Sequence, residues 1–142
     1  MTTTAQTATA ANVQESVPFL GVTHMESSLR FYVDALGFEI TNKWIVDGRI
    51  RWCWLKLGGA SLMLQEFDKN RVPSGKLGEG VSVCFQCKDA LAIYHQAKQR
   101  GLEVRRPFVG NGMWETHLLD PDGYKIGFYS PTDAPEETEY ME

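Results

Sequence analysis

Apolar and polar positions near the start of the chain predict a short strand followed by a helix. Pro18–Val22 is an apolar run of strand length. Thr23 and Glu26 have the spacing of a capping box, in which a hydroxyl and a carboxylate satisfy the free amides at a helix start. Apolar residues then recur at helical spacing, and Gly37 is of the type that ends helices. We therefore expect a helix over about Met25–Leu36.

Three strands are predicted next, because apolar and polar residues alternate between strong hairpin signals. The turns are Asp47-Gly48 and Gly58-Gly59. The expected strands are Phe38–Val46, Arg51–Leu57 and Ala60–Phe67. The element order of the first half is thus βαβββ.

The same order begins again after a polar stretch, Asp68–Gly80. Val81–Cys87 reads as a strand and Asp89–Arg100 as a helix. Strands are then expected at Glu115–Leu119 and after Gly123.

Two segments repeat at one separation. Gly37–Ile40 resembles Gly101–Val104, and Gly59–Leu64 resembles Gly123–Phe128, both 64 residues apart (101−37 and 123−59). Agreement at a single offset indicates an internal duplication. The predicted fold is α+β, with two βαβββ modules whose mixed, cup-shaped sheets each have one helix-covered face and one open face for a ligand.

The expected boundaries follow from these elements. Residues 1–16 form a flexible N-terminal arm without the features of a secretory signal, and residues 132–142 form an acidic C-terminal tail. The single domain covers residues 17–131, with modules at about 17–67 and 81–131 and a linker at 68–80.

Composition narrows the function classes. The 142 residues are 43% hydrophobic, and no apolar run approaches the roughly 20 residues of a membrane span. A net charge of −4 without a long Lys/Arg cluster disfavours nucleic-acid binding. Cys53, Cys84 and Cys87 are odd in number and lie in strand-like stretches, which predicts reduced, small core residues in a cytoplasmic protein.

Two passages carry a family resemblance. Phe31–Phe38, which follows Val22–Leu29, and Gly112–Tyr129, which contains Asp120-Pro-Asp-Gly123, resemble the glyoxalase / bleomycin-resistance / extradiol-dioxygenase (vicinal-oxygen-chelate) superfamily. The similarity covers about Pro18 to Pro131. It implies the paired βαβββ fold and commonly a homodimer, with modules paired within one chain or swapped between two.

The resemblance also locates the metal ligands of metal-dependent members, and this chain departs from that pattern. The corresponding positions hold Val17 or Pro18, Met63, Ser82 and Gly127. None is an ordinary ligand for a divalent metal. We expect no metal and no other cofactor, and Gly127 leaves open the volume that a metal-binding glutamate would fill.

The histidines are the remaining acid/base or metal candidates. His24 is expected at the helix start and His95 on a wet helix face, both exposed. His117 shares a strand face with Glu115, so this pair is the catalytic candidate, either as a pocket pair or as a satisfied sheet pair.

Aromatic residues are the stronger indication of a binding surface, although each is also a candidate for core or dimer packing. Trp52 and Trp54 point to one side of their strand. The predicted ligand-binding residues are Trp44, Trp52, Trp54, Met63, Gln65, Ser82, Phe108, Met113, Trp114, His117 and Tyr129.

The leading hypothesis is a metal-free homodimer that binds a small, partly aromatic molecule, similar to bleomycin-resistance proteins that sequester an antibiotic or toxin. One alternative is an enzyme of the same superfamily (lyase, isomerase or dioxygenase), with unusual metal ligands among His24, Glu66, Glu115 and His117, or metal-independent through Glu115 or His117. A second is a pure interaction module whose tryptophans form an interface.

Overall fold

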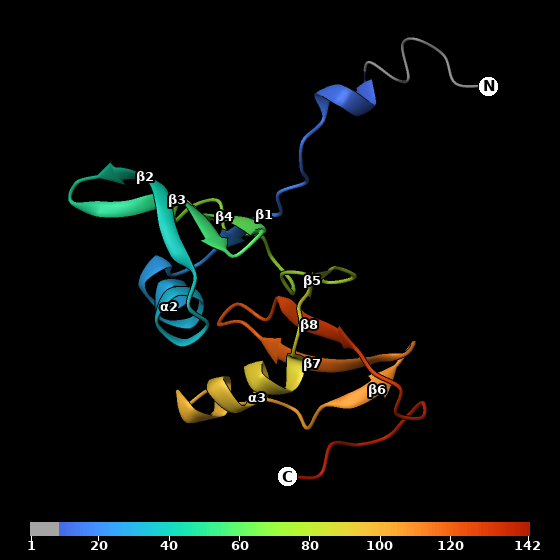
Figure 1. Ribbon diagram of the computed structural model, residues 1–142. Coiled ribbons are helices and arrows are strands. Elements are labelled where there is room, and N and C mark those ends of the chain that lie inside the picture. Colours follow the sequence, from blue (N-terminus) through green and yellow to red (C-terminus); the bar gives the residue numbers. More distant parts are fainter. Residues whose placement is uncertain (1–8) are drawn as a thin grey trace.

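The computed structural model describes residues 9–142, and Figure 1 shows two similar modules joined by a linker. The elements of the first module are β1 (Phe19–Val22), α2 (Met25–Leu29), the π-helix η1 (Arg30–Ala35), β2 (Glu39–Val46), β3 (Arg49–Leu57) and β4 (Ala60–Glu66). Those of the second are β5 (Ser82–Gln86), α3 (Ala90–Gln99), β6 (Phe108–Gly110), β7 (Met113–Leu119) and β8 (Lys125–Pro131).

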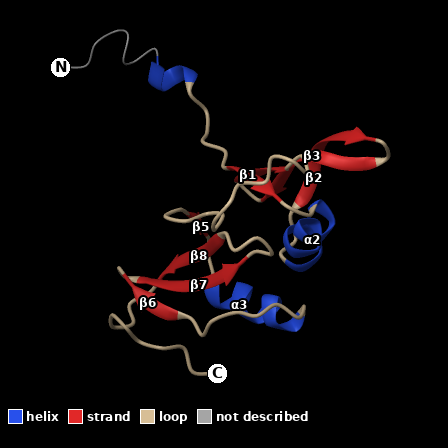
Figure 2. Cartoon of the chain, turned by 180° about the vertical axis from the view of Figure 1, so that it is seen from behind, coloured by secondary structure: helices blue, strands red, loops and turns tan. Residues whose placement is uncertain are grey.

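Each module forms one four-stranded mixed sheet, in the order β1-β4-β3-β2 and β5-β8-β7-β6. The first and last strands of each module pair in parallel, β1 with β4 and β5 with β8. The remaining pairs are antiparallel hairpins. Figure 2 shows a helix beside each sheet, which confirms the predicted α+β fold of two βαβββ modules.

The first helix starts and continues differently from the prediction. Its N-cap is His24, whose Nδ1 accepts from the Ser27 amide at 3.3 Å, so Thr23 is not the cap. After Leu29 the helix widens into η1, where Leu36 N–H donates to the Phe31 carbonyl, five residues back. A single wide turn of this kind changes the angular spacing of the side chains.

A two-residue turn of the same type closes one hairpin in each module. Asp47 and Gly48 have φ of 53° and 73°, and Asn111 and Gly112 have 53° and 74°. Positive φ at both central residues defines the type I′ turn, which matches strand twist and favours Asp-Gly or Asn-Gly. These turns are also 64 residues apart (111−47), a third match to the duplication.

The modules differ most in their outer strand. β2 has eight residues but β6 has three, and residues 102–107 form no strand. Pro107 lies at this point and cannot donate a ladder hydrogen bond. The second sheet therefore has a shortened outer edge.

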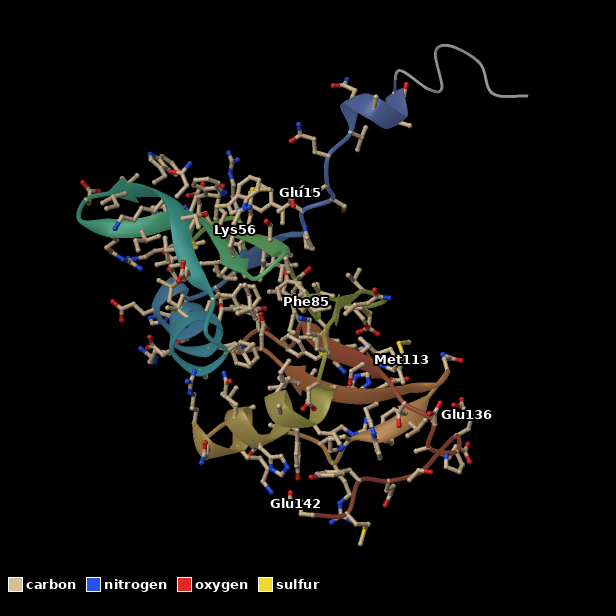
Figure 3. The ribbon with its side chains drawn as sticks, in the orientation of Figure 1. Glu15, Lys56, Phe85, Met113, Glu136 and Glu142 are labelled. Carbon is tan, nitrogen blue, oxygen red and sulfur yellow. The ribbon has the colours of Figure 1, made fainter. Side chains whose placement is uncertain are left out.

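Residues 132–142, expected as an acidic tail, fold back as a strap along β6. Val109 N–H donates to the Thr138 carbonyl at 2.9 Å, and Tyr140 N–H donates to the Pro107 carbonyl at 2.9 Å. The Tyr140 ring meets Trp114 edge-on with centroids 5.8 Å apart. Figure 3 shows Glu142 beside α3, where its carboxylate pairs with Lys98 Nζ at 3.0 Å.

The core continues from one module into the other. Phe38 after η1 meets Phe85 of β5 with ring centroids 5.8 Å apart, and Figure 3 shows Phe85 between the modules. Tyr32, fully buried, donates its phenol hydrogen to the buried Asp120 carboxylate at 2.7 Å. Burial raises the pKa of Tyr32 well above its ordinary value, so the phenol is the donor.

The Asp120-Pro-Asp-Gly turn holds the first module at several further points. Thr23 bonds to the Asp122 carboxylate through its hydroxyl and its amide. The Tyr124 phenol donates to the Gly21 carbonyl at 2.8 Å. Asp120 also accepts from the Asp122 and Tyr124 amides at 2.9 Å each, so its turn is fixed while it binds Tyr32.

The predicted N-terminal arm falls partly outside the described residues, which begin at 9. Residues 9–16 are exposed and extend away from both sheets (Figure 1). None of the helices in residues 9–142 has the length and apolar character needed to cross a membrane.

Replacing Tyr32 by Phe tests the link between the modules. It leaves a buried Asp120 oxygen without its donor, so we expect the free energy of unfolding to fall by about 1–3 kcal/mol in urea titrations. The control is Tyr140→Phe, which loses only an exposed bond to His95 and should change stability by less than about 0.5 kcal/mol. Equal effects of the two changes would contradict this role for Tyr32.

Replacing Tyr140 by Ala tests the strap. The change removes ring contacts with Tyr94, His95 and Trp114, so we expect a loss of roughly 1–3 kcal/mol and faster hydrogen exchange at the Val109 amide. Glu139→Ala, at an exposed neighbouring position, should be nearly neutral. Unchanged exchange at Val109 in the Tyr140 variant would show that the ring does not hold the strap.

Candidate functional site

The open face of the first sheet carries two rows of side chains that cross the strands. The strand register places Phe19 beside Met63 and Met63 beside Trp54. The next row on this face comprises Gly21, Gln65, Trp52 and Trp44. Alternate residues point to the other face, where Leu20, Cys53, Leu55, Leu62 and Leu64 are buried.

This face is apolar and incompletely covered. Phe19 is 56% exposed and Trp44 is 54% exposed, while Trp52, Trp54 and Met63 are partly buried. Within residues 9–142, the buried Trp54 Nε1 and the Ser61 Oγ have no hydrogen-bond partner. Buried donors are normally satisfied, so the unpaired Trp54 Nε1 is an unusual feature beneath this aromatic face.

A cavity of about 360 Å³ lies at the β1/β4 end of this face. The ring of Phe67 lies over Gly21, where a β-carbon would come within 2.1 Å of it. The other lining residues are Phe19, Gln65, Glu66, Asp68 and Arg71. The cavity therefore joins the aromatic face to the start of the polar linker.

Glu66 has a structural role. Its carboxylate accepts from the Met25 amide at 2.8 Å and pairs with Arg49 at 3.1 Å, and Arg51 lies 3.7 Å away. These contacts place it on the side of α2, opposite to Met63. Glu66 thus does not join His24, Glu115 and His117, and these four proposed ligands do not converge.

The open face of the second sheet has matching rows. Cys84, Gly127 and His117 are cross-strand neighbours in one row. The next comprises Gln86, Tyr129, Glu115 and Phe108. Ser82 and Met113 lie on the same face, so five of the predicted binding residues (Ser82, Phe108, Met113, His117 and Tyr129) come together here.

Glu115 and His117 form a pair within an aromatic setting. His117 Nε2 and Glu115 Oε1 are 2.8 Å apart, with side chains 31% and 13% exposed. The Phe108 ring stacks on the imidazole at 5.5 Å with an interplanar angle of 6°, and Tyr129 meets it edge-on. The pair is held in place and has the chemistry of a general base or a hydrogen-bonding anchor.

Tyr129 occupies the volume that Gly127 leaves open. A β-carbon at Gly127 would come within 2.5 Å of the Tyr129 phenol oxygen. Cys84 Sγ lies 3.5 Å from this oxygen. Burial, followed by the contact with Cys84, raises the pKa of Tyr129, so its phenol stays protonated.

The three cysteines, all expected in the core, differ in their burial. Cys53 is buried, and burial raises its pKa to about 11, but Cys84 is exposed on the open face. Cys87 is partly buried, and burial raises its pKa. The expectation of a core residue was therefore wrong for Cys84, because β5 turns its side chain away from Val83 and the core.

Trp114 is the predicted binding residue that the structure places elsewhere. Its cross-strand partner is Ser130, whose hydroxyl accepts from the first amide of α3. Trp114 therefore lies on the helix side, against the strap, and not on the open face. His24 and His95 are exposed, as expected, and bond to Ser27 and Tyr140.

The residues at the family's metal-ligand positions do not fit a metal ion. The register places Phe19, not Val17 or Pro18, beside Met63, and Cys84, not Ser82, beside Gly127. Only Cys84 is an ordinary metal ligand, and the Tyr129 ring fills the space at Gly127. No group of three or more His, Cys, Asp or Glu side chains within residues 9–142 is placed to hold a metal.

Three residues of these faces are absent from the predicted binding set. Phe19 and Phe67 flank the cavity of about 360 Å³, and Cys84 flanks Tyr129. Phe19 alternates with the buried Leu20, which was a usable signal once the strand start was fixed. The position of Phe67 depends on a fold-back over Gly21, which has no local pattern.

Several proteins of known structure have a similar fold. TnmS3, an antibiotic binding protein from Streptomyces sp. CB03234, has 23% identity and a TM-score of 0.68, with 86% of this chain and 98% of that chain covered. TioX from Micromonospora sp. ML1 has 19% identity and a TM-score of 0.67, with 84% and 100% covered.

A bleomycin-binding protein complexed with bleomycin has 21% identity and a TM-score of 0.64, with 84% and 100% covered. These likenesses show the shared fold. No curated protein matches the sequence. The family described as Glyoxalase/Bleomycin resistance protein/Dioxygenase superfamily matches residues 11–128, most of the sequence and both modules. The chain belongs to this superfamily.

Proposed function

We propose that the protein binds a small, partly aromatic molecule against the open faces of its sheets, without a metal, and that this binding sequesters an antibiotic or toxin. The tryptophan face of the first sheet carries the proposal. It combines two partly buried indoles with the exposed rings of Phe19 and Trp44. Large, rigid rings of this kind suit a planar ligand.

The orphan donor at Trp54 supports a ligand with a polar atom. Its buried Nε1 lacks an acceptor within the described residues, and leaving such a group unpaired costs about 1–3 kcal/mol. A bound molecule that offers an oxygen, and displaces the side chains that cover Nε1, would recover that free energy. The neighbours described as antibiotic-binding and bleomycin-binding support the same class of ligand.

We further propose that the functional unit is a homodimer, in which the second copy helps to enclose the ligand. The contacts between the two modules of one chain run through Tyr32–Asp120 and Phe38–Phe85 on the helix side. Phe19 and Val81 are more than half exposed. A sheet of a second copy would cover these apolar surfaces and complete a cup.

A catalytic role without metal is the second candidate, and the Glu115–His117 pair favours it. The two side chains are 2.8 Å apart and the imidazole is clamped by Phe108. Among residues 9–142, no nucleophile bonds to this pair, and the hydrogen bond of Cys84 is to Tyr129. Any reaction of this site would therefore be proton abstraction from the ligand.

Replacing Trp54 by Phe tests the binding face. We expect some planar aromatic compounds in a panel that includes bleomycin to raise the melting temperature and quench tryptophan fluorescence. The variant keeps an aromatic ring but loses the indole donor, so the affinity for such a compound should fall roughly tenfold.

Trp114→Phe is the matched control, because Trp114 lies on the helix side. The affinity of this variant for the compound should stay within about twofold of that of the unmodified protein. Binding that fails across the panel, or that depends on Trp114 and not Trp54, would contradict the proposal. Mass spectrometry of the recovered compound distinguishes the functions: an altered compound whose formation is abolished by His117→Phe would favour the enzyme.

Replacing Phe19 by Asp tests the dimer. Light scattering should give a mass of twice the 16.0 kDa chain for the unmodified protein, and the variant should shift to one chain because a charge at this apolar contact is costly. Val72→Asp changes an equally apolar exposed residue of the linker (46% exposed) and should stay dimeric. A monomeric unmodified protein would contradict the homodimer.

A further inference from the structure

The outer edge of β7 is left open beyond its pairing with β6. The last β6 partner is Phe108, opposite Glu115. Past this point β7 continues to Leu119 and pairs only with β8. Within residues 9–142, Thr116–Leu119 therefore has no strand partner on its outer side, and its backbone offers free polar groups there.

The segment that would cover this edge instead forms the wall of a cavity. Residues 102–105 stand away from β7, and the space between them measures about 640 Å³. This volume lies within the usual range of about 300–1,000 Å³ for small-molecule sites. Its apolar lining is Phe31, Leu102, Val104, Leu118, Leu119 and Pro121.

The lining of this cavity includes two basic and two acidic side chains, and among the described residues the basic ones are the free pair. Arg105 comes from the 102–105 segment and Lys125 from the start of β8, and both are exposed. Within the described part of the chain neither has an ion pair or a side-chain hydrogen bond. Glu103 is the exposed acid of the lining, whereas the Asp120 carboxylate is buried and bonded to Tyr32.

We propose that this cavity is a second binding site, for a small amphiphilic anion such as an alkyl or aryl carboxylate. The carboxylate would bind between the free cations of Arg105 and Lys125, which supply charge-assisted hydrogen bonds. The apolar body would lie against Phe31 and Leu118. The open strand edge adds amide donors, as sheet edges do in other anion sites.

The cavity lies at the outer edge of the second sheet, away from the tryptophan face of the first sheet, and it shares His117 with the open face of the second sheet. Phe31 comes from η1 and Leu118 from the helix side of β7, whereas Leu119 and Lys125 lie on the side of the open face. The open edge is also too short for an added peptide strand, because it spans Thr116–Leu119 and ends at the Asp120 turn. A cavity of about 640 Å³ fits a small molecule better.

Decanoate is a suitable probe, with decan-1-ol and decyltrimethylammonium as neutral and cationic probes of equal chain length. Calorimetry of the full-length protein, below the micelle concentrations, should show saturable binding of decanoate alone. Amide resonances of Leu118 and Leu119 should shift on its addition. Those of Trp52 and Trp54 should not, which distinguishes this site from the tryptophan face of the first sheet.

The double change Arg105→Gln with Lys125→Gln should weaken decanoate binding roughly tenfold. Both side chains are exposed, so the fold should be kept. Arg106→Gln is the matched control, because Arg106 contacts Met141 of the strap and not the cavity, and binding should be unchanged. No decanoate binding, equal binding of the three probes, or shifts confined to the tryptophan face would each overturn the proposal.

Discussion

The hydrogen bond from Tyr32 to Asp120 fixes one module on the other. It joins two fully or nearly fully buried side chains 88 positions apart in sequence. A buried carboxylate is costly unless it is bonded, and Asp120 meets this need with Tyr32 and two amides of its own turn. The same turn holds Thr23 and Gly21, so β1, η1 and the β7–β8 connection are positioned together.

This docking on the helix side leaves both open faces free. Successive side chains of a strand alternate faces. Because β4 buries Leu62 and Leu64 on the helix side, it presents Met63 and Gln65 on the open face. The tryptophans of β3 follow from the same alternation. The open faces thus result from the way the helices cover the other side of each sheet.

Local patterns were sufficient for most of the fold, and contacts distant in sequence account for the rest. The hairpin turns, the helix stripes and the repeat are short-range signals, so element order and the open face of Trp52 and Trp54 were predictable. The facing of Trp114 follows from the same alternation with Glu115 and His117, and its inclusion among the predicted binding residues overlooked this. Tyr129 over Gly127 and Phe67 over Gly21 depend on side-chain folding across the sheet, which periodicity does not report.

Gly127 shows that a member of this family can lack the metal ligand that metal-dependent members carry at the same position. Its duplicate in the first module is Met63, 64 positions earlier (127−63), and both stand where metal-dependent members of the family carry a ligand. Restoring a carboxylate at Gly127 would not restore a metal centre, since the Tyr129 ring already fills that space and Phe19 and Met63 offer no nitrogen or oxygen. In the second module, the missing side chain at Gly127 leaves room for the protonated Tyr129 phenol, which packs beside Cys84 and His117. The open face therefore presents a phenol, a thiol and the Glu115–His117 pair beside aromatic surface, and within residues 9–142 these groups are not placed to hold a metal.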